Sequence, residues 1–196
     1  MHKNPQMDKV YTIPDLTSCL SLMDEYGMFV NIRHHCLVVA LISAQLWDGL
    51  AVMQGTERLP DKKELIMGAL LHDIAKTPCL GQECNHALMG AEICREHGFE
   101  EIAPIVAEHV RLSDFNLGRY QKGQFLAKEL VYYADKRVLH HLVVSLGMRL
   151  EYILDRYGQN NPARCALIKE NFQQCEFFEK ELFSWLPFSP EQLSLP

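Results

Sequence analysis

A histidine and an aspartate stand side by side, as His72-Asp73, next to an apolar stretch of the chain. The apolar run of residues 65–71 precedes them directly. Burying an imidazole and a carboxylate without partners is unfavourable, so such a pair needs a compensating interaction. A divalent cation is the simplest one, because it can bind an imidazole nitrogen and a carboxylate oxygen together. The pair therefore predicts a metal site.

Four further side chains of metal-ligating type fall in predicted helices: His35, His86, His109 and Asp135. Imidazoles and carboxylates that project from facing helices are a common way to build a metal site inside a helical bundle. Four histidines and two aspartates are more than one tetrahedral zinc ion needs. The set suits two divalent cations of the Fe, Mn, Co or Ni type, with Mg or Zn as alternatives.

The spacing of apolar residues predicts the helices that must position these side chains, and it predicts no strand. Asp61 and Asn85 stand where N-caps are expected, and Gly98 stands where a helix is expected to end. The polar segment 111–123 is expected to be a loop that could cover a site. The predicted helices span about 12–26, 29–53, 61–76, 85–97, 99–110, 126–138, 142–157 and 162–185.

The chain has 196 residues, 48% of them hydrophobic, which is enough for one domain with a substantial core. We expect an N-terminal helix in residues 1–28, a central all-α core in 29–157, and a C-terminal helix and tail in 158–196. Prolines at 187, 190 and 196 predict that the tail is loose.

Composition excludes several classes of partner. A net charge of −6 argues against binding to nucleic acid, which needs clustered Lys and Arg. No apolar stretch approaches the roughly 20 uncharged residues that span a bilayer, so no membrane partner is expected. The N-terminus lacks the apolar middle of a signal peptide. These features predict a cytoplasmic protein.

The chain contains seven cysteines, and none of them forms a CxxC pair. An odd number is unusual for a disulfide framework, and reduced thiols are the rule in the cytoplasm. We therefore expect the cysteines to act as small apolar residues, including Cys79 and Cys84, which are five residues apart.

The candidate ligands occur in the order His, His-Asp, His, His, Asp, and this order resembles the HD-domain (HDIG-type) metal-dependent phosphohydrolase superfamily. The resemblance covers about residues 29–157 and is strongest in 35–40, 70–76 and 133–136. It implies an all-α HD-domain bundle of about seven or eight helices. By this resemblance the core ligands are His35, His72, Asp73 and Asp135. The second pair in dinuclear members corresponds to His86 and His109, and Asp73 would bridge the two ions.

The resemblance implies a phosphohydrolase that acts on a nucleotide or another small phosphate ester. Cations lower the pKa of bound water to about 7, which makes hydroxide available as the nucleophile. The expected catalytic residues are Asp73 and Lys76, and the expected substrate-binding residues are Lys76, Arg33, Arg111 and Arg149. Some relatives carry a catalytic glutamate where this chain has Lys76, so that mechanism is not transferred.

Two other functions are compatible with the same ligands. Some HD-domain proteins with this set hold di-iron and oxidise organic substrates with dioxygen. A non-catalytic HD module that binds a nucleotide is the other alternative. The ligand set does not separate the hydrolase from the oxygenase.

Overall fold

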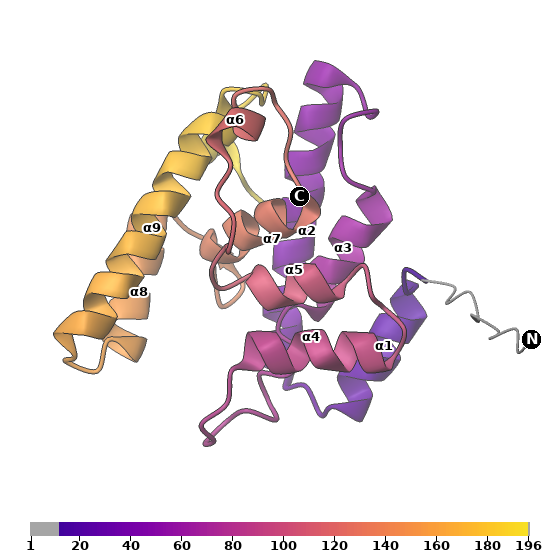
Figure 1. Ribbon diagram of the computed structural model, residues 1–196, viewed down its shortest axis with the longest axis vertical. Helices are drawn as coiled ribbons and strands as arrows, with labels where there is room; N and C mark the ends of the chain where they lie inside the picture. Colours follow the sequence, from indigo (N-terminus) through magenta and orange to yellow (C-terminus); the bar gives the residue numbers. More distant parts are fainter. Residues whose placement is uncertain (1–11, 196) are drawn as a thin grey trace, which may run out of the picture.

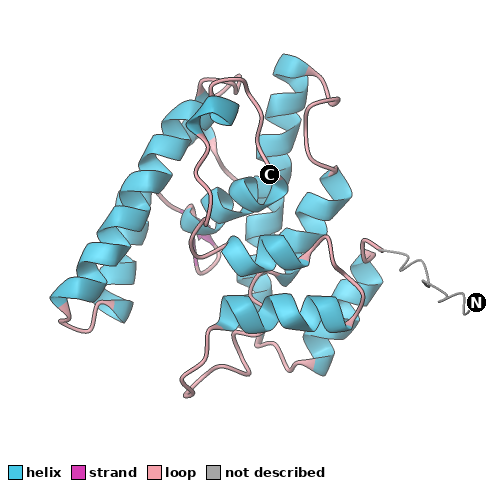
Figure 2. Ribbon diagram, viewed as in Figure 1, coloured by secondary structure: helices cyan, strands magenta, loops and turns pink. Residues whose placement is uncertain are grey.

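Helices make up nearly all of the regular structure in the computed structural model, which describes residues 12–195 (Figures 1 and 2). In this part of the chain there are nine α-helices and one two-stranded antiparallel hairpin, so the all-α prediction is confirmed. The helices are α1 (Leu16–Glu25), α2 (Val30–Gln54), α3 (Lys62–Leu71), α4 (His86–Glu96), α5 (Ala103–Glu108), α6 (Leu117–Tyr120), α7 (Ala127–Lys136), α8 (Leu146–Tyr157) and α9 (Pro162–Phe183). The strands are β1 (Val138–Leu139) and β2 (Leu142–Val143).

Several helices begin at side-chain N-caps, and two of these, Asp61 and Asn85, are predicted from the sequence. The side chain of Asp15 accepts a hydrogen bond from the backbone N–H of Ser18 at 2.8 Å. The side chain of Asp61 accepts one from Glu64 at 2.8 Å. Asn85 accepts from the N–H of Ala87 at 3.1 Å and so caps α4. Each cap satisfies a backbone donor that has no partner inside its helix.

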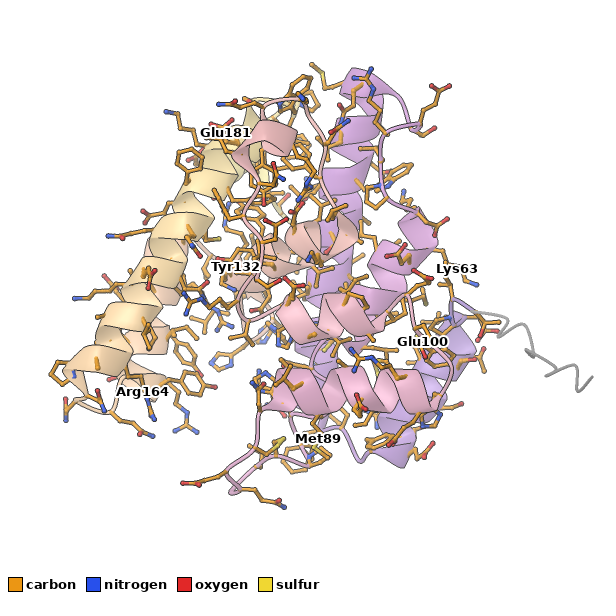
Figure 3. The ribbon with its side chains drawn as sticks, in the orientation of Figure 1. Lys63, Met89, Glu100, Tyr132, Arg164 and Glu181 are labelled. Carbon is orange, nitrogen blue, oxygen red and sulfur yellow. A yellow bond between two sulfur atoms is a disulfide. The ribbon has the colours of Figure 1, made fainter. Side chains whose placement is uncertain are left out.

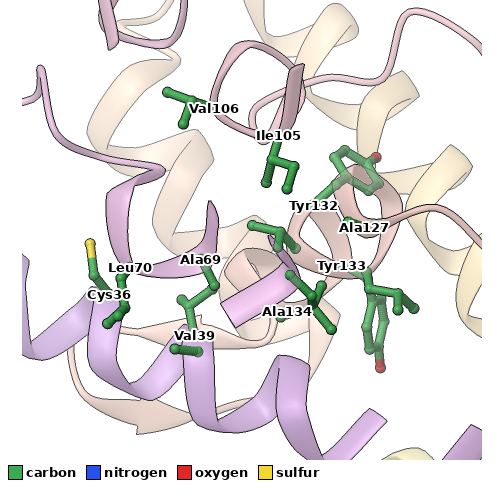
Figure 4. Close-up of a cluster of buried hydrophobic side chains, with 14 of the residues drawn as sticks. Cys36, Val39, Ala69, Leu70, Ile105, Val106, Ala127, Tyr132, Tyr133 and Ala134 are labelled. Carbon is green, nitrogen blue, oxygen red and sulfur yellow. The ribbon is translucent and has the colours of Figure 1, made fainter. Parts of the chain in front are cut away.

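The centre of the core lies where α2 packs against α3 and α7. Figure 4 shows Val39, Ala69 and Ala134, from these three helices, among the buried side chains. Helix α9 packs on α7 through aromatic rings, and the Phe178 ring lies 6.1 Å from that of Tyr133. In Figure 1, α8 and α9 lie side by side along one flank of the molecule.

The sequence analysis found no apolar stretch long enough to span a bilayer, but helix α2 is such a stretch by length and composition. It has 25 residues, and an 18-residue window reaches a mean hydropathy of 1.8, which is long and apolar enough to cross a membrane. Half of that window is buried inside the protein, because α3 and α7 cover α2 from two sides. A helix enclosed in this way is apolar over most of its circumference.

Several predicted boundaries need correction. Helix α1 begins at Leu16 rather than near residue 12, and α5 begins at Ala103 rather than near residue 99. Helix α3 ends at Leu71 rather than near residue 76, and tight turns follow, in which the N–H of Ile74 donates to the Leu71 carbonyl at 2.9 Å. The helix expected from residue 142 begins only after Ser145, because the β1–β2 hairpin occupies 138–143. Within the loop 111–123 the chain forms the short helix α6.

The structure also corrects the expectation for the cysteines. Cys79 and Cys84 form a disulfide, with their Cα atoms 5.6 Å apart. The turn between them contains Gly81, whose φ of +75° lets the chain reverse within a few residues. The five other cysteines are free thiols, as expected.

The C-terminal tail is held against the domain rather than loose. Residues Pro190–Gln192 form a 3-10 turn, and the side chain of Leu193 is buried. The Pro190 carbonyl accepts a hydrogen bond from the Arg137 guanidinium at 2.9 Å. This bond and the buried leucine fix the tail.

Candidate metal centre and its cavity

The six predicted ligands come together from five helices or helix ends. His35 lies in the second turn of α2, and His86 is the first residue of α4. His109 directly follows α5, and Asp135 lies in the last turn of α7. The pair His72-Asp73 directly follows α3. A helix end gives a side chain freedom to turn toward a neighbouring helix, which explains why four of the five positions are at helix ends.

These side chains form two clusters. The first contains His35, His72 and Asp135, and the second contains Asp73, His86 and His109. Within each cluster the ligand atoms lie within 4.8 Å of one another. Each cluster has the kind and number of side chains that could hold a metal ion.

Asp73 lies between the clusters and presents one carboxylate oxygen to each. Its Oδ2 atom is 3.5 Å from Nε2 of His72 and 4.0 Å from Nε2 of His35. Its Oδ1 atom is 3.4 Å from Nε2 of His86 and 3.5 Å from Nε2 of His109. This is the arrangement that a bridging carboxylate requires.

Backbone carbonyl groups orient three of the imidazoles. Nδ1 of His72 lies 2.7 Å from the carbonyl oxygen of Ala69, and Nδ1 of His109 lies 2.7 Å from that of Val106. Nδ1 of His35 lies 3.2 Å from the carbonyl oxygen of His140. A carbonyl only accepts, so Nδ1 is the donor in each ring. This leaves Nε2 of His72 and His109 facing the cluster as a lone pair, whereas Nε2 of His35 lies 2.9 Å from Oδ1 of Asp135. Metal-binding histidines are held in this way.

Among the six ligands, two buried polar atoms have no hydrogen-bond partner in the described part of the chain: Nε2 of His72 and Oδ1 of Asp73. Both residues are almost fully buried, so leaving these atoms without partners is unfavourable. Imidazole nitrogen and carboxylate oxygen are donors that divalent transition metals bind. The residues present therefore fit a pair of cations.

The charges in the clusters favour metal binding. Burial alone would raise the pKa of the Asp73 carboxyl, but Lys76 and His72 outweigh burial and hold it well below its usual range. Burial would also raise the pKa of the Asp135 carboxyl. A hydrogen bond from His35 and the charge of Arg149 outweigh burial and hold this pKa well below its usual range. Burial lowers the pKa of His72 to about 3. At neutral pH the carboxylates are charged and His72 is neutral, as metal ligands must be.

Cys36 is the one residue near the ligands that the sequence analysis did not consider for this role. Its sulfur lies within 4.8 Å of the ligand atoms of His72 and Asp73. The thiol is fully buried, and burial raises its pKa well above the usual value. Because metals bind the thiolate, we assign Cys36 to the core rather than to the ligand set.

The clusters open into a cavity of about 490 Å³. This volume is within the usual range for a small-molecule site. Four of the six ligands are among the lining residues that the core helices and their ends contribute: Asp73, Lys76, His86, His109, Val110, Asp135 and Lys136. The loop 77–85 contributes Cys79, Leu80 and Cys84, and α8 and α9 contribute Arg149, Ile153, Tyr157, Arg164, Ile168, Asn171 and Phe172.

Two of the four expected substrate-binding residues lie in this cavity. Nζ of Lys76 donates to Oδ2 of Asp73 at 2.7 Å. Burial would lower the pKa of Lys76, but Asp73 and Asp135 raise it above its ordinary value, so this side chain is charged. The Arg149 guanidinium is buried and lies 3.6 Å from Oδ1 of Asp135.

The other two expected substrate-binding residues, Arg33 and Arg111, do not line the cavity. Arg33 bonds to the carbonyl oxygens of Met28 and Met23 and to Asp24, which fastens α1 to α2. Arg111 is half exposed and lies 3.8 Å from Glu170 on the surface of α9. Each arginine is close to a ligand in the sequence, but its side chain is bound to groups that lie away from the clusters.

Lys136 and Asn171 are contributors that the sequence analysis missed. Nζ of the buried Lys136 donates to the carbonyl oxygens of His109 and Val110, each at 3.1 Å. Nδ2 of Asn171 on α9 donates to the same Val110 carbonyl at 2.9 Å. These bonds fix the end of α5 that carries His109. Lys136 follows Asp135 directly in the sequence, and that adjacency was the only signal available.

Comparisons with known proteins agree with this site. A family model described as HD domain matches residues 32–138, more than half of the chain. An uncharacterized protein of Methanocaldococcus jannaschii is 30% identical over 150 residues, covering 72% of this chain and 86% of that protein. A tRNA (cytidine(56)-2'-O)-methyltransferase of Thermoplasma volcanium is 34% identical over 103 residues, covering 52% of this chain and 28% of the enzyme. No solved structure matches significantly.

Proposed function

This chain belongs to the HD-domain family, and we propose that it is a metal-dependent phosphohydrolase that acts on a nucleotide or another small phosphate ester. One observation carries the proposal. Asp73 presents one carboxylate oxygen to each of two ligand clusters, at the inner end of a cavity large enough for a small molecule.

The charge of the cavity favours an anionic substrate. Four cationic side chains line it: Lys76, Lys136, Arg149 and Arg164. In the described part of the chain, the only acidic residues that line it are Asp73 and Asp135, which are ligands. The chain as a whole has a net charge of −6, so this is a local excess of positive charge. Such a field concentrates anions at the site.

In the proposed enzyme, His35, His72 and Asp135 hold one cation, and His86 and His109 hold the other. Cations held by these residues would lower the pKa of water enough to make a nucleophile available at neutral pH, and they would offset negative charge on the phosphoryl oxygens. Asp73 contributes to both sites and keeps its charge because Lys76 lowers its pKa. The ammonium group of Lys76 lies 2.7 Å from Oδ2 of Asp73 and lines the cavity, where it can bind a phosphoryl oxygen.

Arg149 offers a second cationic group that can bind the substrate. Its Nη2 atom lies 3.6 Å from Asp135, while its Nε atom is buried without a hydrogen-bond partner among the residues described. A guanidinium suits phosphate because its donors are arranged in a fixed fork. We assign Arg149 to orientation of the phosphoryl group, together with Lys76.

The cationic lining also supports hydrolysis over the two alternatives. An oxygenase of organic substrates has no general need for four cations around its cavity. A non-catalytic module has no need for six intact ligands, all of which are present here. The choice of hydrolysis therefore rests on two observations together: the six ligands and the positive charge of the cavity wall.

The test combines metal analysis with a screen for phosphate release. Protein purified without oxygen is analysed for Fe, Mn, Co, Ni, Zn and Mg, and is then incubated with nucleotides and simple phosphate esters. We expect about two ions per chain and metal-dependent release of phosphate. Consumption of dioxygen without release of phosphate from any ester would contradict the proposal, as would full metal occupancy without turnover.

A further inference from the structure

The outer wall of the cavity is built from a part of the chain that the HD-domain match does not include. The match ends at residue 138, whereas this wall consists of side chains from α8 and α9. The two helices pack against each other and are joined by a short connection at residues 158–161. The family match thus accounts for the metal clusters, while these two helices line the rest of the cavity.

The chemistry of this wall changes along its length. Arg149 of α8 and Phe172 of α9 lie at the inner end, beside the clusters. Ile153 and Ile168 come next, and Arg164 lies at the outer end, where it donates to the Tyr157 carbonyl at 3.5 Å. Figure 3 shows Arg164 at the end of α9 that adjoins α8. Eight residues of helix separate Arg149 from Tyr157, which is a distance of about 12 Å.

Arg164 is a cation without an acidic partner among the described residues. Its Nη1 atom donates to the neutral side chain of Gln159 at 2.6 Å and to the Tyr157 carbonyl. The acids that line the cavity are the ligands Asp73 and Asp135, at the other end. A guanidinium with unpaired donors at the rim of a pocket suits a carboxylate or a phosphate.

We infer that Arg164 forms a second anion-binding subsite, and that the substrate is an organic phosphate with an apolar middle and a second anionic group at its far end. This inference rests on the proposed function, which places the reacting phosphoryl group at the clusters. Ile153 and Ile168 contact the apolar middle of the substrate. The α8–α9 pair therefore determines which phosphate esters this chain accepts.

The experiment compares two series of synthetic substrates. One series is n-alkyl phosphates, and the other is alkyl phosphates of the same length that end in a carboxylate, with chains that reach about 12 Å. In the unmodified protein the carboxylate should lower KM about 10-fold at the longest chain length. Arg164→Gln should abolish this advantage, so that the carboxylate-ended and methyl-ended esters of the same length have KM values within about 2-fold of each other.

Arg156→Gln is the matched control, because Arg156 is an exposed arginine of α8 that does not line the cavity. This control should keep the full advantage of the carboxylate. An advantage that persists in Arg164→Gln, or that is absent from the unmodified protein, would overturn the inference. The same holds if Arg156→Gln reduces the advantage as much as Arg164→Gln does.

A binding measurement separates this inference from the proposed function. Alkyl phosphonates with and without a terminal carboxylate contain no ester bond to cleave, and calorimetry measures their affinity directly. Tighter binding of the carboxylate form that depends on Arg164 supports the subsite even if no ester is hydrolysed. Equal affinity of the two forms, or no binding of either, would overturn it. Failure of the proposed function alone would appear as binding without phosphate release.

Discussion

Replacing Asp73 by asparagine is the most informative perturbation of the two clusters. Asparagine has the shape of aspartate and can still accept the bond from Lys76, but it lacks the negative charge. The second cluster then holds only His86 and His109, which are neutral ligands. The first cluster keeps Asp135 together with His35 and His72. We therefore expect the Asp73→Asn variant to bind about one ion per chain instead of two.

The loss should also appear in stability. An ion present at about 100 times its Kd stabilises a folded protein by about 2.7 kcal/mol. For a chain of this size each kcal/mol changes Tm by about 2–4 °C, so loss of one ion should lower the metal-dependent part of Tm by about 5–11 °C. Phosphate release should fall about 1,000-fold or more, because a metal supplies several kcal/mol of charge stabilisation.

The assay measures metal content by mass spectrometry and Tm with and without a chelator. Taking the difference between the two Tm values removes any effect of the substitution on the metal-free fold. Asp155→Asn, at an exposed position of α8, is the control and should behave like the unmodified protein. Two ions bound at the original strength would refute the bridging role of Asp73. Loss of both ions would refute the independence of the first cluster.

Three further predictions concern single residues. Lys76→Met should leave metal content unchanged and reduce kcat/KM about 10- to 100-fold, since it removes a charge-assisted bond to the substrate; an unchanged rate would exclude Lys76 from the site. In metal-free protein, the depressed pKa of His72 means that its contribution to stability is complete above pH 6.5 and is lost as the pH falls toward about 3. Urea unfolding from pH 7.5 to pH 5 should therefore show a loss of about 2 kcal/mol that His72→Gln reduces, and equal pH dependence of the two proteins would contradict this. Glu129→Ala should lower the free energy of unfolding by about 3–5 kcal/mol, because the buried carboxylate binds Arg119 and the Tyr120 hydroxyl; the exposed Glu176→Gln should have little effect, and equal stability of the two variants would contradict the role of this network.

The sequence was sufficient to predict the helical class and the six side chains that the structure brings together in two clusters, for physical reasons that can be named. A histidine and an aspartate next to an apolar run are expected to be buried, and a shared metal ion is the simplest partner that both can bind. His35 and Asp135 lie in helices that the sequence predicts. The N-caps Asp61 and Asn85 were equally predictable, because the capping bond is local.

The outer wall of the cavity was not predictable in the same way. Ile168 and Phe172 belong to an apolar face of α9, and such a face looks the same in sequence whether it covers a core or lines a cavity. Arg164 has the character of an ordinary surface arginine until α8 is placed beside it. Arg33 and Arg111 show the reverse error, since proximity in sequence to a ligand did not bring either side chain to the site.

The bonds at the Val110 carbonyl have a consequence for how metal and substrate affect each other. That one oxygen atom accepts from Lys136 and also from Asn171 of α9, directly beside the ligand His109. A ligand that draws α9 inward therefore acts on the same backbone segment that orients His109. By thermodynamic reciprocity, occupancy of the second metal position and affinity for the organic part of the substrate should change together.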